Sequence, residues 1–125
     1  MNKPTSPTQK IGNIAEEKAS AYLIKANCKI VEKNFTCTFG EIDLIIRDHD
    51  YLVFVEVRYR GKEDFGSGAE TVSLTKQRKI IRSAQRYLQY KKIGDLIPCR
   101  FDVVSMTLNE EKQFKIDWIK DAFQL

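Results

Sequence analysis

The sequence predicts one α/β (α+β) domain in which a mixed central sheet of about five strands is flanked by two main helices. Two long segments, residues 9–27 and 73–92, repeat apolar residues at helical spacing. Shorter runs between and after them are rich in Ile, Val, Leu and Phe, or alternate apolar with polar residues, as strands do. The chain has 125 residues, a typical length for a single domain with one hydrophobic core. We therefore expect residues 1–125 to form one domain.

The first predicted helix covers residues 9–27, after a tail of residues 1–8 that contains two prolines and that we expect to be loose. At about 100° per residue, Glu16 falls at the edge of the apolar stripe of this helix and Glu17 nearly opposite it. Glu17 should therefore face solvent, whereas Glu16 lies where the helix meets the sheet. There Glu16 is either a boundary residue with its carboxylate in water or part of a site.

A strand is predicted at residues 29–35, and a β-hairpin follows at residues 40–60, where two apolar runs flank a turn at Asp48-His49-Asp50. Charged residues are almost never fully buried unless they are paired. Four nevertheless interrupt these core-like strands: Glu41, Asp43, Glu56 and Arg58. They indicate a functional site in the hairpin.

The side-chain pattern also predicts the register of the hairpin. The first strand has one all-apolar row, which comprises Ile42, Leu44 and Ile46. Opposed residues of an antiparallel pair point to the same side of the sheet, so this row should face the apolar row of the second strand. A two-residue loop at His49-Asp50 achieves this and sets Asp43 directly opposite Glu56. Because opposed like charges destabilise a sheet, we predict a divalent cation between these two carboxylates.

His49 is the single histidine, and its place at the turn favours a solvated role over that of a ligand or general base. Nucleophilic triads are set aside because one turn histidine cannot build them. Three cysteines without a Cys-x-x-Cys pair are typical of reduced thiols in the cytoplasm. The net charge of +4 is only a weak sign of an anionic partner. The sequence has no apolar run of membrane-spanning length, so we expect a cytoplasmic protein outside the membrane.

A glycine-rich loop is predicted at residues 61–72, directly after the strand that bears Glu56 and Arg58. Loops of this length are often lids or binding loops. Both a lid over the site and an ordinary flexible connection remain open.

The second predicted helix, residues 73–92, begins with Ser73 or Thr75 as its N-cap and stops at Gly94. Its buried stripe comprises Ile80, Ile81, Ala84, Tyr87 and Leu88. Seven basic residues and no acidic residue lie in it: Lys76, Arg78, Lys79, Arg82, Arg86, Lys91 and Lys92. A solvated helix face usually mixes both signs, so we favour a nucleic-acid-binding surface over a merely solvated one. That surface comprises Lys76, Arg78, Lys79, Arg82, Arg86 and, at the end of the hairpin, Arg60.

Two residues near the start of this helix have special positions. Gln77 points into the middle of the apolar stripe, where a polar group needs a partner. It either caps local backbone or reaches the carboxylates of the hairpin. Lys76 lies at the edge of the stripe and is able to reach the carboxylates as a cation.

The chain ends in two further predicted strands. The first covers residues 100–108, and the second alternates apolar and polar residues from Phe114 to Trp118. Asp102 lies beside the hairpin strands, but its neighbour Arg100 offers an ion pair. A structural role for Asp102 is therefore favoured over a catalytic one.

Taken together, these residues resemble the PD-(D/E)XK nuclease superfamily, with an acid in the first helix, then Asp43, then Glu56-Val57-Arg58, then a helix carrying Gln77. More closely, the chain resembles the YraN family of endonuclease-like, archaeal-resolvase-like domains. The matching segments span nearly the whole chain: Gly12–Glu16, Asn34-Phe35, residues 40–45, Phe54–Val57, Lys76-Gln77 with Tyr87-Leu88, and Pro98–Val103 with Asp121-Ala122-Phe123.

The resemblance implies a restriction-endonuclease-like fold and a catalytic group, which comprises Glu16, Asp43, Glu56, Arg58 and Gln77. Asp43 and Glu56, with Glu16 bound directly or through a water, would hold Mg²⁺ or Mn²⁺. The third motif position is normally lysine, and here it is Arg58, which stays charged and is a poor base. Either Lys76 supplies the missing cation or the attacking water needs no side-chain base.

The implied function is that of a metal-dependent endonuclease acting on DNA rather than RNA, including branched or structured substrates. An alternative is a nucleic-acid-binding module with a nuclease fold that has lost catalytic turnover. A third reading is an adaptor whose basic helix meets an acidic protein. A resolvase would need two sites, which predicts a C2 homodimer.

Overall fold

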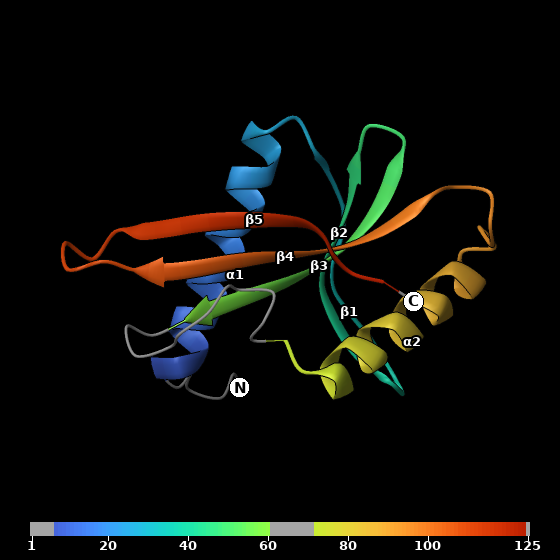
Figure 1. Ribbon diagram of the computed structural model, residues 1–125, viewed down its shortest axis with the longest axis horizontal. Helices are drawn as coiled ribbons and strands as arrows, with labels where there is room; N and C mark the ends of the chain where they lie inside the picture. Colours follow the sequence, from blue (N-terminus) through green and yellow to red (C-terminus); the bar gives the residue numbers. More distant parts are fainter. Residues whose placement is uncertain (1–6, 61–71, 125) are drawn as a thin grey trace, which may run out of the picture.

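The computed structural model describes residues 7–60 and 72–124, and it confirms a mixed five-stranded sheet with two helices (Figure 1). The elements in chain order are α1 (Pro7–Lys25), β1 (Lys29–Cys37), β2 (Gly40–Asp48), β3 (Tyr51–Arg60), α2 (Leu74–Tyr90), β4 (Cys99–Leu108) and β5 (Phe114–Phe123). The predicted loop at residues 61–72, for which a lid and an ordinary connection both remained open, lies outside the described residues except for Val72.

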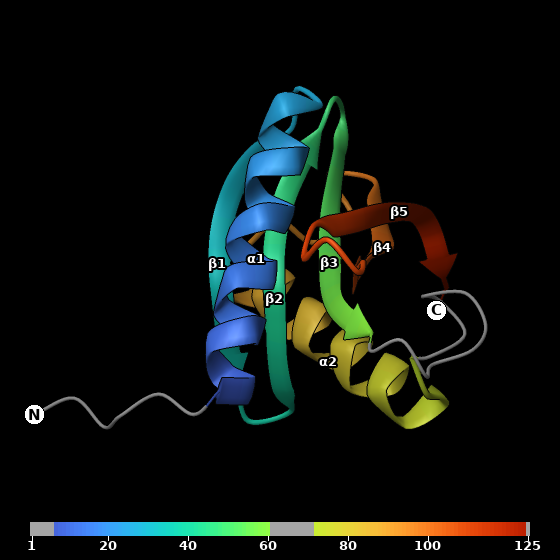
Figure 2. The same cartoon turned by 90° about the vertical axis from the view of Figure 1, so that its left-hand side faces the viewer.

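The strands lie in the order β1-β2-β3-β4-β5. Neighbouring strands are antiparallel except β3 and β4, which are parallel and are joined by the crossover that contains α2. Parallel neighbours require such a crossover. The two helices cover opposite faces of the sheet, with α1 in front of β1 and β2 in Figure 2 and α2 behind them.

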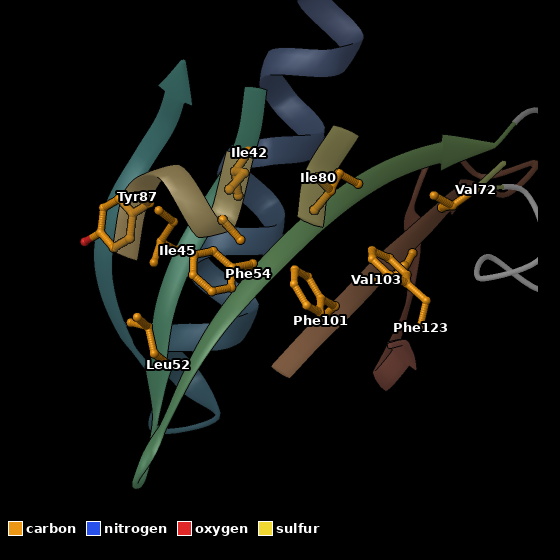
Figure 3. Close-up of a cluster of buried hydrophobic side chains, with 11 residues drawn as sticks. Ile42, Ile45, Leu52, Phe54, Val72, Ile80, Tyr87, Phe101, Val103 and Phe123 are labelled. Carbon is orange, nitrogen blue, oxygen red and sulfur yellow. The ribbon is translucent and has the colours of Figure 1, made fainter. Parts of the chain in front are cut away.

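Each face of the sheet carries its own apolar core, which explains why the central strands are apolar on both sides. The core under α2 includes Ile42, Ile45, Phe54, Ile80, Tyr87, Phe101 and Phe123, seen in Figure 3. The core under α1 includes Ala15, Ala19, Leu23, Leu44, Ile46, Val53, Val55 and Met106. Phe101 stacks on Phe54 at 5.6 Å and on Phe123 at 5.2 Å, so β5 is fixed to the centre of the sheet by ring contacts.

Several element ends differ from the sequence prediction. Pro7 and Thr8, expected in the loose tail, belong to α1, while residues 1–6 lie outside the described part of the chain. Helix α1 ends at Lys25 because Asn27 adopts a left-handed φ of 69° and the Cys28 N–H turns back to the carbonyl of residue 23.

Strand β1 also extends further than predicted. Asn34 stays within the strand with a left-handed φ of 54°, a conformation that asparagine tolerates better than most residues. The strand continues to Cys37 and contains a bulge between Ile30 and Glu32. The chain then turns through Thr38-Phe39 into β2.

The central hairpin has the predicted two-residue loop at His49-Asp50, with Asp48 paired to Tyr51. The paired register of β2 with β3 runs only as far as Leu44 and Val55.

Beyond that pair the sheet splits. Strand β2 stays with β1 as far as the pair of Cys37 with Gly40, whereas β3 stays with β4 as far as the pair of Arg60 with Thr107. Figure 1 shows the two pairs of strands diverging. We call the space between them the fork of the sheet.

The fork corrects one detail of the predicted side-chain rows. Ile42 was expected to share a face with Leu44 and Ile46, but it packs in the core under α2 while the other two pack under α1. The change occurs where β2 leaves β3 and remains paired with β1 alone.

Helix α2 begins after Ser73, whose Oγ accepts a hydrogen bond from the Lys76 N–H at 3.1 Å. It ends at Tyr90, two residues earlier than expected. Lys92, and not Gly94, provides the left-handed residue at the end, with a φ of 57°, and the Ile93 N–H returns to the carbonyl of residue 88. Its buried residues are Ile80, Ser83, Ala84 and Tyr87, so Ser83 joins the predicted stripe.

At the closed end of the hairpin, Asp102 is fully buried and multiply hydrogen-bonded. Its carboxylate accepts two bonds of 2.9 Å from Arg100, one of 2.8 Å from Trp118 Nε1 and one of 2.9 Å from the Asp121 N–H. Arg100 also bonds to Asp48 at 2.8 Å. The predicted ion pair is confirmed, and the network ties β2, β4 and β5 together.

Candidate active site

Asp43 lies in the fork, at the point where β2 leaves β3. Its Oδ2 accepts a hydrogen bond of 2.8 Å from the Val57 N–H. In a continued hairpin ladder that N–H would bond to a backbone carbonyl of β2, so the side chain of Asp43 replaces a lost backbone partner. The Asp43 carboxyl group also contacts the side chains of Glu16 and Glu56. Burial raises the pKa of Asp43, although the Val57 N–H opposes this shift.

Glu56 occupies the opposite arm of the fork, on β3. Its side chain is buried, with a residue exposure of 5%. Burial, followed by the negative charge of Asp43, raises the pKa of Glu56 to about 8, and the positive charges of Lys76 and Arg58 lower it in part. Asp43 and Glu56 thus lie in contact, but they are not directly opposed as the predicted register had them, because the pairing of β2 with β3 ends at Leu44 and Val55. The charge of Asp43 disfavours the ionisation of Glu56.

Helix α1 adds a third carboxylate. One oxygen from each of Glu16, Glu41 and Asp43 lies within 4.8 Å of the others, so these three residues form a potential metal-binding group. Burial raises the pKa of Glu16, and the charges of Asp43 and Glu41 raise it further. Glu16 is thus part of the cluster rather than a boundary residue pointing into water.

Asn34 lies beside this group and was not among the predicted site residues. With its amide nitrogen turned toward the carboxylates, Nδ2 is 2.9 Å from Glu41 Oε1 and 3.3 Å from Glu16 Oε2. The Asn34 side chain, on a residue with a left-handed backbone, thus lies beside the middle of α1, where Glu16 is. The hydrogen bond to Glu16 favours the ionised form of that carboxyl group.

Lys76 provides the cation next to the carboxylates. Its Nζ lies 3.6 Å from Glu56 Oε1, and the first turn of α2, capped by Ser73, holds it there. Arg58 also acts favourably on Glu56 from two residues along β3. Gln77, by contrast, donates its recorded hydrogen bond to the Val72 carbonyl at 3.0 Å, which is the local contact that the sequence left open as one alternative.

The structure therefore brings together most of the predicted site residues, namely Glu16, Asp43, Glu56, Arg58 and Lys76. It adds Glu41 to the carboxylates that share the potential metal-binding group. The sequence contained the signal for Glu41, because it is a charged residue in a core-like strand, two positions before Asp43. It contained no comparable signal for Asn34 beyond its place in one of the segments that match the YraN family.

The predicted nucleic-acid-binding residues lie mainly on the outer side of α2. Arg78, Lys79, Arg82 and Arg86 are exposed. Arg60 is half-buried at the end of β3, and Lys76 is half-buried where α2 meets the fork. The predicted positive helix face is thus accessible to solvent, and its first residue belongs to the carboxylate site.

His49 lies at the hairpin turn with an 85% exposed side chain and a left-handed φ of 55°. Its position agrees with the solvated role that the sequence favoured. Among residues 7–60 and 72–124, no helix has both the length and the apolar composition needed to cross a membrane.

Comparison with known proteins identifies the family. Residues 15–106 match the family described as "Uncharacterised protein family UPF0102". A UPF0102 protein of Nitrosomonas europaea is 46% identical over 112 residues, which cover 90% of this chain and 92% of the relative. A UPF0102 protein of Coxiella burnetii is 46% identical over 120 residues, which cover 96% and 97% of the two chains. A UPF0102 protein of Legionella pneumophila is 43% identical over 116 residues, which cover 93% and 96%. The chain therefore belongs to the UPF0102 family, the YraN-like group that its motifs resemble.

Proposed function

We propose that this protein is a metal-dependent endonuclease that hydrolyses phosphodiester bonds in DNA. The observation that carries the proposal is the group of Glu16, Glu41 and Asp43 in the fork. Glu56 contacts Asp43 from the other arm, and Lys76 lies against Glu56. Four carboxyl groups from three elements lie close together, and the pKa values of Glu16, Asp43 and Glu56 are raised, which shows that their ionisation costs stability. Such an arrangement is typical of a functional site.

The donor set fits a hard divalent cation. Carboxylate oxygens are the ligands that Mg²⁺ and Mn²⁺ prefer, and the described residues of the fork provide no thiolate or imidazole that would favour zinc. Asp43, which contacts both Glu16 and Glu56, would be the shared ligand, with Glu16 and Glu41 on one side and Glu56 on the other. When bound, such an ion polarises the scissile phosphate and lowers the pKa of an attacking water.

The protein's own cations complete the site. Lys76 reaches Glu56 from α2, which supports the proposal that its ammonium group takes the role that lysine normally has at the third motif position. The Lys76 side chain is 43% exposed, and it is therefore available to an incoming phosphate or water. Arg58 carries a guanidinium group, which is suited to stabilising negative charge on the transferred phosphoryl group rather than to removing a proton.

The identity of the substrate rests on the charge of α2. A helix with four exposed basic residues on its outer side and Lys76 at its start leads directly to the carboxylates. Such a run of positive charge is suited to a phosphate backbone. We propose DNA, including branched or otherwise structured DNA, as the substrate. Cutting two strands of a junction would need two copies of the site, and we propose that the protein acts there as a homodimer.

The test is cleavage of labelled branched, flapped, duplex and single-stranded DNA with Mg²⁺ or Mn²⁺, comparing the wild type with Asp43→Asn and Glu56→Gln. The asparagine side chain keeps an oxygen that can accept the Val57 N–H, whereas alanine at this position would remove both a ligand and a strand contact. Glu17→Gln is the matched control, because Glu17 is exposed on the same helix as Glu16. Cleavage that persists in both site variants would refute the proposal.

A second function is a nucleic-acid-binding module that has lost turnover, and one observation favours it: Arg58 stands where the superfamily motif normally has lysine. It predicts binding that weakens with salt and with Arg82→Ala and Arg86→Ala, and no cleavage with any divalent metal. Any cleavage that requires Asp43 would exclude it.

A further inference from the structure

A cavity of about 670 Å³ lies against the C-terminal half of α2. Its lining comprises Phe39, Arg82, Gln85, Arg86, Leu88, Gln89, Gly94 and Asp95. Phe39 belongs to the turn between β1 and β2, and it is 44% exposed. This turn lies beside α2, because a Cβ placed on Gly40 would be 3.6 Å from Ser83 Oγ and 3.8 Å from Lys79 Cβ. An aromatic ring from one element thus stands next to the arginines of another.

A second cavity, of about 430 Å³, lies between α2 and β1 and shares Arg86 with the first. Tyr90, 70% exposed, lines it from the last turn of α2. Arg86 therefore stands between two cavities, each with an exposed aromatic ring. Each lining also contains one acidic residue, Asp95 in the first cavity and Glu32 in the second. The basic residues of both linings, Arg82 and Arg86, come from α2, so α2 provides the groups that can bind an anion.

These features continue the site in the fork. At about 100° per residue, Lys76, Lys79, Arg82, Arg86 and Tyr90 fall within about a third of the circumference of α2. They form one stripe, which starts at Glu56 and ends at the cavities. The helical rise between Lys76 and Arg86 is about 15 Å, which corresponds to about four nucleotides of one DNA strand.

The side chains of the stripe favour single-stranded over duplex nucleic acid. Arginines bind phosphates, the amides of Gln85 and Gln89 can bond to base edges, and aromatic rings stack on bases. In a duplex the faces of the bases are already stacked on each other, so exposed rings gain a partner only from unpaired bases. Phe39 and Tyr90 would have no such partner on intact duplex.

We propose that this stripe and its two cavities hold a single-stranded DNA segment that leaves the carboxylate site along α2. The inference rests on the proposed function, whose substrate it narrows to DNA with an unpaired arm next to the scissile bond. Arg82 and Arg86 hold phosphates of the arm, and Phe39 and Tyr90 stack on its bases.

The test is binding without cleavage, measured by fluorescence anisotropy in EDTA. The probes are a single strand of about 12 thymidines, within the usual site size of such grooves, and a duplex of the same length. We expect Phe39→Ala and Tyr90→Ala each to weaken single-strand binding by about 5- to 100-fold and to change duplex binding by less than about twofold. Arg86→Gln should reduce the slope of log affinity against log salt by about 0.7.

Two matched variants show whether single-strand affinity depends on ring stacking rather than on an apolar side chain, and on the position of a basic residue rather than on its charge alone. Phe39→Leu keeps an apolar side chain without a π face and should lose nearly as much affinity as Phe39→Ala. Lys115→Ala removes an exposed charge from β5 and should leave binding within about twofold of the wild type. Thermal melting of each variant establishes that it is folded.

Unchanged single-strand affinity in both aromatic variants would overturn the proposal, as would an equal loss on duplex. Tighter binding of a uridine oligonucleotide than of the thymidine one would overturn the assignment to DNA. Because EDTA prevents metal-dependent cleavage, the failure of the groove and the failure of the nuclease are separable. Ring-dependent binding without cleavage refutes only the nuclease, and Asp43-dependent cleavage without ring-dependent binding refutes only the groove.

Discussion

Replacing Glu56 with glutamine should stabilise the metal-free protein, although Glu56 is a central residue of the candidate site. Its carboxyl group is buried beside Asp43, which raises its pKa from 4.5 to about 8. A group with a raised pKa in the folded state contributes its full stability below pH 4.5 and loses it as the pH rises through 8. Glutamine is neutral in both the folded and unfolded states, so this pH-dependent loss disappears in the variant.

The magnitude follows from the width of that pH window. At pH 7, about 2.5 pH units above the ordinary pKa, the wild type has lost about 3 kcal/mol relative to its stability near pH 4.5. The charge of Lys76 is one of the causes that set this pKa, and at pH 7 the Glu56 carboxyl is mostly protonated, so the change to glutamine removes little of the ion pair with Lys76. We therefore expect Glu56→Gln to be more stable by about 3 kcal/mol at pH 7, equivalent to a rise in Tm of about 10 °C.

The assay is urea unfolding in EDTA from pH 4.5 to 8, with Glu17→Gln as the control for loss of an exposed carboxylate on α1. The difference between Glu56→Gln and wild type should be near zero at pH 4.5 and should grow steadily toward pH 8. Adding Mn²⁺ should then stabilise the wild type more than the variant, because the ion binds only the folded site. A variant that is equally stable as the wild type at pH 8, or a difference independent of pH, would refute the reasoning.

Three further predictions concern the cations and the closed end of the hairpin. Lys76→Met should raise the pKa of Glu56 further and lower the rate of single-turnover cleavage by about 100-fold or more. Arg58→Lys should change the cleavage rate by less than about tenfold. If Arg58→Lys had the larger effect, Arg58 and not Lys76 would be the important cation. In the Lys76→Met variant, the Mn²⁺ affinity measured by calorimetry should fall at pH 7 and recover toward pH 9, as Glu56 ionises. An affinity that does not change with pH would contradict the effect of the Lys76 charge on the ionisation of Glu56. Arg100 holds the pKa of Asp48 below its usual 3.8, so this carboxylate contributes stability above pH 4 that is lost as the pH falls below it. Asp48→Asn should therefore destabilise the protein by about 2 kcal/mol at pH 7 in urea unfolding and by progressively less toward pH 3, and a constant difference would count against the ion pair.

The sequence predicted the central hairpin well because the features that define a hairpin lie close together in the sequence. The alternation of side chains and the two-residue loop at His49-Asp50 define one register, and that register places Asp43 near Glu56. The helical stripe of α1 likewise placed Glu16 at the sheet, where the structure finds it beside Asp43.

Features that depend on missing contacts were less predictable. No residue pattern indicates that β2 and β3 separate after Leu44 and Val55, and without the fork Ile42 was assigned to the wrong face. The contact of Asn34 with Glu41 and Glu16 depends on the path of β1 past the middle of α1, so it required the three-dimensional structure. Lys76 was predicted as a cation able to reach the site. Its pairing with Glu56 became clear only from the position of the first turn of α2 in the structure.

The parallel pairing of β3 with β4 has a consequence for how the site is assembled during folding. Asp43 and Glu56 come from one hairpin and can approach early, but Lys76 lies on the crossover that must be in place before β4 can pair with β3. Contacts between distant segments form late in folding, because their loop entropy has to be overcome first. A partly folded chain would thus hold several repelling carboxylates without their cation. Metal uptake during refolding would report the last docking step of the domain, and a divalent ion present in the cell would draw the folding equilibrium toward the native state.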